Sequence, residues 1–160
     1  MPKIILKTII NSSIEICFDL SRSIDLHKIS TAKTNEEAIA GKTSGLISLG
    51  EFVTWRAKHF GIYQNLTSQI TKYEKPFHFQ DVQLKGAFKY FVHDHYFKVL
   101  DDKVIMEDHF DFKSPFGFIG SLFDIIILTK YLSKFLIERN NLIKAYAETD
   151  KWRGILNGNA

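Results

Sequence analysis

Five strand-like stretches follow one another between residues 51 and 112, and the segments that join them are very short. Each stretch is rich in β-branched and aromatic residues, and they are separated by Gly61, Lys75-Pro76, Gly86 and Asp101-Asp102. Connections of this length join antiparallel neighbours in hairpins and are too short for a crossover to a parallel strand. This part of the chain therefore predicts an antiparallel meander.

The segment that follows the first strand candidate predicts two short helices. Ser12 is followed three residues later by Glu15, which is the spacing of a capping box, and apolar residues at helical spacing come next. A second helix is expected over residues 24–30, with Ser23 as its N-cap.

Strand composition also marks residues 3–10 and 36–41, which gives seven strands in all. After the meander, residues 118–147 carry apolar side chains at helical spacing and predict one long helix. An antiparallel sheet of this size must bury one face, and the long helix offers the largest apolar surface. The predicted fold is α+β, with a curved seven-stranded antiparallel sheet wrapped round the C-terminal helix. One domain is expected over residues 1–148, with a frayed tail over residues 149–160.

The two-residue turn Asp101-Asp102 sets the pairing of the last two predicted strands. Counting outward from this turn places His95 opposite Asp108 and Phe97 opposite Met106. One face then contains Phe91, His93, His95, Phe97 and Val99 together with Val104, Met106, Asp108, Phe110 and Phe112. The other face is mostly polar, so the first face is expected to point toward the long helix.

The pairing of the preceding strand depends on the length of the loop before it. A loop of three residues, 86–88, places Asp81 opposite His93 and turns Asp81 and Gln83 inward. A loop of two residues turns Gln80 and His78 inward instead. We favour the longer loop because it gives the imidazole a carboxylate partner.

It is unusual for the inner face of a strand to carry two imidazoles between phenyl rings. An unpaired buried polar group costs about 1–3 kcal/mol, so His93 and His95 need partners, which Asp81 and Asp108 can supply. Three interpretations are open: a closed hydrogen-bond network that fixes strand register, the polar end of a ligand cavity, or acid–base chemistry with His95 and Asp108 as catalytic residues. A metal site is a further possibility, because His93, His95, Asp81 and Asp108 include acceptable ligands, but it is not favoured, since His-x-His on one strand is a weak signal and no group of cysteines supports it.

Further candidates for the cavity wall lie on three segments. Trp55 falls on the inner face of its strand, where core packing and ligand contact fit the pattern equally well. The loop 42–50 has an apolar centre between two glycines, and it is either a gate or a plug of the core. Phe118, Leu122 and Ile126 are expected on the cavity side of the long helix.

The stretches "GKTSGLISLGEFVTWRAKHFG", "FHFQDVQLKGAFKYFVHDHYF" and "MEDHFDFKSPFG", in this order of elements, resemble the START-like (SRPBCC) superfamily of helix-grip proteins. Polyketide cyclases and lipid-transfer domains belong to this superfamily, and the chain looks most like its small stand-alone bacterial members. The resemblance covers residues 2–148. It implies a deep, largely apolar cavity between the sheet and the long helix, whose ligand varies widely among members.

The expected function is therefore binding or carriage of a small hydrophobic or amphipathic molecule, such as a lipid, an isoprenoid or a polyketide-like compound. The alternatives are a cyclase or dehydratase that uses the His95–Asp108 pair, and a groove that docks a partner segment. No cofactor is expected, because no cofactor fingerprint is present. The residues expected to contact the ligand are Trp55, Asp81, Gln83, Phe91, His93, His95, Phe97, Met106, Asp108, Phe110, Phe118, Leu122 and Ile126.

Charge and cysteine content exclude several other classes. The net charge is +3 and the basic residues are scattered, so a nucleic-acid partner is not expected. The single cysteine rules out an intramolecular disulfide and fits a reducing compartment. The most apolar stretch is interrupted by Asp124 and Lys130, so no transmembrane segment is expected, and no signal peptide is evident. The chain is predicted to be cytoplasmic, and nothing in it indicates a homo-oligomer.

Overall fold

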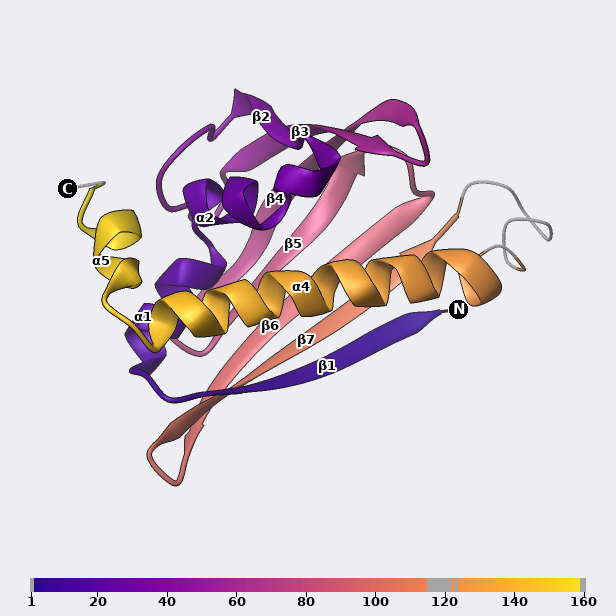
Figure 1. Ribbon diagram of the computed structural model, residues 1–160. Coiled ribbons are helices and arrows are strands. Elements are labelled where there is room, and N and C mark those ends of the chain that lie inside the picture. Colours follow the sequence, from indigo (N-terminus) through magenta and orange to yellow (C-terminus); the bar gives the residue numbers. More distant parts are fainter. Residues whose placement is uncertain (1, 115–121, 123, 159–160) are drawn as a thin grey trace.

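A seven-stranded antiparallel sheet forms the larger part of the computed structural model, which describes residues 2–114, 122 and 124–158 (Figure 1). The strands lie in the order β1-β7-β6-β5-β4-β3-β2, so the meander is continuous and β1 pairs with its last strand. They are β1 (Lys3–Ile10), β2 (Glu37–Gly41), β3 (Phe52–His59), β4 (Ile62–Glu74), β5 (His78–Lys85), β6 (Tyr90–Leu100) and β7 (Lys103–Lys113). The predicted fold class and the predicted sheet are confirmed.

Helices cover one face of this sheet. The long helix α4 (Thr129–Ala147) lies across that face, with α1 (Ile14–Ser21) and α2 (Ile24–Ser30) beside it (Figure 1). The remaining helical elements among the described residues are the 3-10 helix η1 (Ala32–Thr34), the π-helical turn η2 (Asp124–Leu128) and the short helix α5 (Lys151–Leu156). None of the described helices is both long enough and apolar enough to cross a membrane.

The two short helices begin at serine caps. Ser23 caps α2 as predicted, and its side chain accepts a hydrogen bond from the backbone N–H of Leu26 at 3.1 Å. The cap of α1 is Ser13 and not Ser12, because it is Ser13 that accepts from the N–H of Ile16, at 3.3 Å. The predicted start of α1 is therefore one residue too early. The short segment between the two helices lies beside the cavity described below.

The predicted strand register is confirmed in both hairpins. His95 lies opposite Asp108 across β6 and β7, and Asp81 lies opposite His93 across β5 and β6. Asp101 and Asp102 have φ angles of 49° and 60°, the left-handed backbone that a two-residue hairpin turn of type I′ requires.

The predicted inner face of β6 and β7 is buried with one exception. Val99 is 60% exposed, whereas every other member of this face, from Phe91 to Phe112, is buried. The difference arises because the end of this hairpin extends beyond the helices that cover the sheet (Figure 1). The inner face therefore ends at Phe97 on β6.

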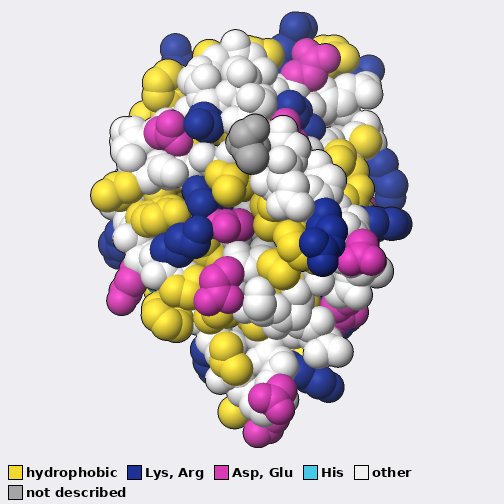
Figure 2. Space-filling view, turned by 90° about the vertical axis from the view of Figure 1, so that its left-hand side faces the viewer, with side chains coloured by type: hydrophobic (Ala, Val, Ile, Leu, Met, Phe, Trp, Pro, Cys, Tyr) yellow, Lys and Arg dark blue, Asp and Glu magenta, His cyan; other side chains and the backbone are white. Residues whose placement is uncertain are grey.

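The chain beyond α4 is helical and packed. Trp152, Ile155 and Leu156 of α5 are partly buried against the core beside α1. The prediction of a frayed tail is therefore wrong for residues 151–156, because these side chains share one side of the helix and cover apolar surface. Figure 2 shows this end of the molecule, where hydrophobic side chains lie among interspersed basic and acidic ones.

The helix before residue 129 differs from the predicted one. Residues 124–128 form a π-helical turn, which changes the phase of the side chains relative to a continuous α-helix. Leu122 and Ile126 are consequently 55% and 59% exposed, so the prediction that they face the cavity is wrong. Phe118, the third residue predicted here, lies outside the described residues.

Candidate functional site

A cavity of about 350 Å³ lies between the inner face of the sheet and α4. Its lining is mainly apolar and comes from strands β3 to β7, from α2 and from α4. Six of the residues predicted to contact a ligand line this cavity: Trp55, Asp81, Phe91, His93, His95 and Phe110. The sheet and α4 therefore enclose a hollow of the kind that the sequence predicted.

Four other predicted contacts do not line the cavity. Phe97 and Met106 are buried in the core near α1, beyond the cavity wall. Gln83 supports the β5–β6 loop, where its side chain exchanges hydrogen bonds with the backbone N–H and C=O of Phe88. Asp108 is fully buried and lies behind the two histidines. For these four residues the prediction of direct ligand contact is wrong. The alternation of side chains along a strand shows which face of the sheet a residue lies on, but not whether that part of the face borders the cavity.

A polar layer crosses the core where β5, β6, β7 and α4 meet. The polar layer consists of Asp81, His93, His95, Asp108, Arg139 and Asn140. A hydrophobic cluster lies on each side of it: one contains Phe91 and Phe110, and the other contains Phe97 and Met106. Polar groups were predicted at one end of the cavity, whereas the structure places them between two apolar regions.

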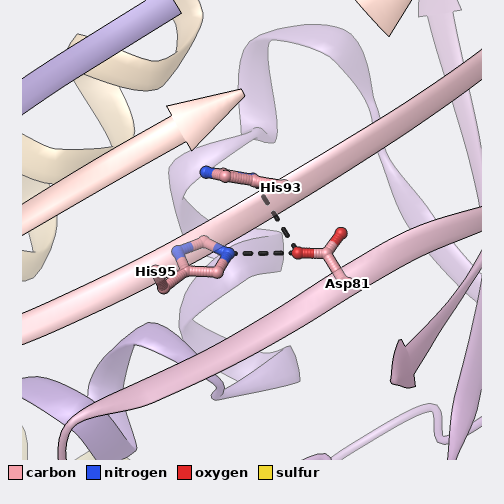
Figure 3. Close-up of side chains that lie close together, drawn as sticks. All are labelled: Asp81, His93 and His95. Atoms are coloured by element: carbon pink, nitrogen blue, oxygen red, sulfur yellow. Dashed lines mark hydrogen bonds and ion pairs between the residues drawn. The ribbon is translucent and has the colours of Figure 1, made fainter. Parts of the chain in front are cut away.

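The two histidines of β6 meet Asp81 of β5 at the cavity wall (Figure 3). His95 Nε2 lies 3.0 Å from Asp81 Oδ1, and His93 Nδ1 lies 3.8 Å from the same oxygen. The imidazole rings are close neighbours, with 3.8 Å between their centroids. Phe79 stacks on His95 with a centroid distance of 4.2 Å, which fixes the plane of that ring.

Asp108 of β7 holds the histidines from the opposite side. His93 Nε2–H donates to Asp108 Oδ1 at 2.9 Å, and Asn140 Nδ2–H donates to Asp108 Oδ2 at 2.6 Å. His95 Nδ1 is also 2.9 Å from Asp108 Oδ1, but its angle is too poor for a hydrogen bond. His95 Nδ1 is the one buried side-chain nitrogen or oxygen without a hydrogen-bond partner among the described residues.

Arg139 of α4 adds a positive charge to the polar layer. Its Nη2 donates to the backbone carbonyl of Ser21 at 2.8 Å, and its Nη1 donates to Asn140 Oδ1 at 3.2 Å. Nη1 is also 3.7 Å from Asp108 Oδ1. Arg139 borders the cavity, whereas Asn140 is turned toward β7, so consecutive helix residues serve the cavity and the core.

The surroundings of these groups shift their pKa values in opposite directions. Burial disfavours the charged form of Asp108, but the hydrogen bond from His93 and the adjacent His95 outweigh it and hold its pKa well below the usual range. Burial likewise opposes ionisation of Asp81, yet its hydrogen bond with His95 lowers its pKa. Burial and the neighbouring His95 lower the pKa of His93. Burial also works against a charged His95, but Asp108 and Asp81 raise its pKa.

These directions describe a charge-balanced layer. Asp81 and Asp108 are both carboxylates, and a carboxylate only accepts hydrogen bonds. The ring nitrogens of His95 lie 3.0 and 2.9 Å from these two carboxylates, which favours the doubly protonated ring. His93 is the neutral partner and carries its hydrogen on Nε2, facing Asp108, so its Nδ1 has a lone pair. Two negative charges are then offset by Arg139 and His95.

Sequence reasoning missed the contribution of α4 to this layer. Arg139 and Asn140 interrupt an apolar stripe that includes Leu136 and Ile143, and both are buried. Polar residues inside a stripe of helical spacing are the signal that identifies them. His59 and Tyr131 are hydrogen-bonded to each other at 2.8 Å at the cavity wall, and no comparable pattern in the sequence identifies this pair.

Trp55 packs against a histidine that the sequence did not single out. The rings of Trp55 and His27 lie 4.3 Å apart between centroids, and His27 Nε2 is 2.9 Å from Glu36 Oε1. All three residues line the cavity. Trp55 therefore contributes both to the core and to the cavity wall, which are the two roles that the sequence left open.

The loop 42–50 is attached to the helices. Ile24 N–H donates to the carbonyl of Gly45 at 2.9 Å, and Ile47 N–H donates to the carbonyl of Arg22 at 3.2 Å. Ile47 is buried in the core and also lines the cavity. Arg22 Nη1 donates to the carbonyl of Ile47 at 3.1 Å. These contacts match the plug interpretation of the loop.

Comparison with known proteins reveals similarity in structure only. No family model and no curated protein matches the sequence. Protein TTHA0849 from Thermus thermophilus matches with a TM-score of 0.70 and 11% identity, covering 91% of this chain and 99% of that one. The major latex-like protein 151 from Panax ginseng matches with a TM-score of 0.67 and 17% identity, covering 92% and 98%. The fold is the helix-grip fold. Ara h 8.0201, at a TM-score of 0.62 and 9% identity over 91% and 97% of the two chains, shares it.

Proposed function

We propose that the protein binds a small hydrophobic or amphipathic molecule in the cavity between the sheet and α4. The observation that carries this proposal is the hollow itself: about 350 Å³, enclosed by aromatic and aliphatic side chains, with a few polar groups on its wall. Ligand pockets typically measure about 300–1,000 Å³ and have this mainly apolar make-up. The helix-grip fold supports the proposal, because START-like proteins of this fold typically hold such ligands.

The polar layer supports an amphipathic ligand over a pure hydrocarbon. Asp81, His93, His95 and Arg139 all border the cavity and include both donors and acceptors. Apolar wall continues on both sides of them, from Phe91 in one cluster and from Ile47 in the other. A hydroxyl or carbonyl group near the middle of an otherwise apolar molecule fits this distribution. Lipids, isoprenoids and polyketide-like compounds with such a group are the candidate class.

Two measurements test the proposal. Native mass spectrometry of freshly purified protein, followed by organic extraction, reveals any molecule that the protein carries. A fluorescent fatty-acid analogue added to the extracted protein then measures binding directly. The proposal is wrong if the purified protein carries no molecule and the extracted protein gains neither fluorescence nor thermal stability with any lipophile tested.

A pair of adjacent residues on α4 gives a matched control for this binding assay. Leu136 lines the cavity, whereas the side chain of Ile137 is 44% exposed. Leu136→Trp is expected to fill the cavity and abolish binding of the analogue, while Ile137→Trp leaves it unchanged. Equal binding by the two variants contradicts a ligand site at this cavity.

Acid–base catalysis is a second candidate function, favoured by the pairing of the histidines with carboxylates. Asp108 fixes the tautomer of His93, and His95 is held between Asp81 and Asp108 at 3.0 and 2.9 Å. A cyclase or dehydratase reaction uses such groups to move protons on a bound substrate. His95→Gln separates the two functions: retained ligand affinity with lost turnover supports the enzyme, and lost affinity alone supports the carrier.

A further inference from the structure

Three potential metal ligands converge at one point of the cavity wall. Asp81, His93 and His95 each offer one ligand atom, and these atoms all lie within 4.8 Å of one another. The shortest separation is 3.0 Å, between Asp81 Oδ1 and His95 Nε2, and His93 Nδ1 lies 3.8 Å from the same oxygen. Figure 3 shows both rings directed at that carboxylate from neighbouring positions on β6.

We propose that Asp81, His93 and His95 bind a divalent transition-metal ion, such as Zn²⁺. Bonds of about 2.0–2.1 Å in a tetrahedral site place the ligand atoms about 3.3 Å apart. The observed separations of 3.0 and 3.8 Å lie on either side of this value. All three separations lie within 4.8 Å, so rotations of the side chains toward a common ion are needed to complete the geometry.

Asp108 supplies a second, independent reason for this assignment. A histidine that ligates a metal through one nitrogen usually donates its other N–H to a carboxylate, which fixes the tautomer. Here a single oxygen, Asp108 Oδ1, lies 2.9 Å from the rear nitrogen of each ring, His93 Nε2 and His95 Nδ1. The hydrogen bond to Asp108 holds His93 with its opposite nitrogen toward Asp81, and His95 presents its Nε2 to the same carboxylate.

A metal ion would also give both ring nitrogens of His95 a partner. In the structure described above, its Nε2 is bound to Asp81 and its Nδ1 lacks a well-angled partner. A metal ion that bonds Nε2 leaves Nδ1–H as the only donor of the ring. A small rotation then aligns this N–H with Asp108, 2.9 Å away.

The charge of the layer allows a cation at this position when the metal ion replaces the proton on His95 Nε2. With both histidines neutral, as metal binding requires, Asp81 and Asp108 contribute two negative charges and Arg139 contributes one positive charge. Arg139 is turned away, since its Nη2 is hydrogen-bonded to the carbonyl of Ser21 at 2.8 Å. These charges leave the site with one net negative charge, and a divalent ion more than neutralises it.

Two histidines and one carboxylate leave coordination positions open, as in catalytic zinc sites and in mononuclear iron sites. Asp81, His93 and His95 line the cavity and Asp108 does not, so the open positions face the cavity. An ion there binds an oxygen of a cavity ligand or activates a water molecule. The proposal does not depend on the hydrophobic ligand proposed above, because the metal is measured without it.

The test uses untagged protein freed of metals by a chelator and titrated with Co²⁺ and Zn²⁺. One Co²⁺ per chain is expected, with visible absorption bands of a four- or five-coordinate ion, and Zn²⁺ is expected to displace it. His93→Gln and Asp81→Asn are expected to lose these bands. Asp108→Asn is expected to keep them and to weaken binding about 10–100-fold, the usual loss when such a supporting carboxylate is removed.

A histidine–carboxylate pair on the opposite face of the sheet gives the control. His78 Nε2 lies 2.7 Å from Asp94 Oδ1, and neither residue lines the cavity. His78→Ala is expected to bind Co²⁺ as wild type does. The proposal is overturned if wild-type protein shows no site of micromolar affinity or better, or if His93→Gln and Asp81→Asn bind as well as His78→Ala. Circular dichroism identifies any variant that fails to fold, and Asp81→Asn, at the least buried of the three ligands, serves as the second ligand variant.

Discussion

Replacing Asp108 by asparagine removes one charge from the centre of the polar layer while keeping the size of the side chain. Asp108 is fully buried and accepts hydrogen bonds from His93 at 2.9 Å and from Asn140 at 2.6 Å. In Asp108→Asn the amide oxygen replaces only one acceptor, and the amide N–H₂ faces donors. Asn140 or His93 is then left without its partner in the core.

The expected loss of stability follows from these contacts. A hydrogen bond to a charged group contributes about 1.5–3 kcal/mol, and removing one partner of a buried ion pair costs about 3–5 kcal/mol. We expect Asp108→Asn to lower the free energy of unfolding by about 3–5 kcal/mol. Because the free energy of unfolding of a small domain is about 5–15 kcal/mol, the variant should fold but should unfold at a much lower urea concentration than the wild type.

Asp94 of β6 provides a matched comparison on the outer face of the same sheet. It also accepts from a histidine and an amide, His78 at 2.7 Å and Gln80 at 2.9 Å, but its side chain is 17% exposed. Asp94→Asn is expected to cost about 1 kcal/mol or less, since water screens and replaces these contacts. Urea unfolding followed by tryptophan fluorescence measures both variants. Equal losses within about 1 kcal/mol would refute the view that the inner layer lies in a dry, low-dielectric environment.

Three further predictions concern other parts of the chain. Burial raises the pKa of Cys17 to about 12, so iodoacetamide should modify it only as fast as the protein unfolds, which intact-mass spectrometry in a urea series measures. Ile143→Ala, at a buried position of α4, should lower the free energy of unfolding by about 2–5 kcal/mol, whereas Ile137→Ala, at an exposed position of the same helix, should change it by less than about 1 kcal/mol. Arg22→Ala removes the side-chain hydrogen bond to the loop 42–50, so amide hydrogen exchange in that loop should accelerate while exchange in the central strands stays unchanged.

The strands and their register were predictable because local signals determine them. The turn Asp101-Asp102 fixes the pairing of His95 with Asp108, and the alternation of side chains then determines which face is buried. Preferring a carboxylate partner for His93 selected the correct register for the preceding strand. These inferences need only the period of two and the length of a loop.

The helical side of the site was not predictable to the same depth. The prediction that Leu122 and Ile126 face the cavity assumed one α-helix of 3.6 residues per turn. A π-helical turn at residues 124–128 breaks that period. Arg139 and Asn140 interact with Ser21 and Asp108, which are 118 and 32 residues away in the chain. Contacts of that separation depend on how α4 is placed across the sheet, and no local pattern encodes that placement.

The arrangement of the polar layer argues against a network whose purpose is only to fix strand register. Such a network is most stable when every polar atom finds its partner within the protein, since each buried atom left without one costs free energy. Here Asp81 retains a side-chain exposure of 20% at the cavity wall, and His95 Nδ1 has no well-angled partner. His93 Nδ1 is 3.8 Å from the nearest carboxylate oxygen, beyond hydrogen-bond distance. Asp81 and His93 Nδ1, which both face the cavity, are therefore the groups placed to meet a ligand or a metal ion.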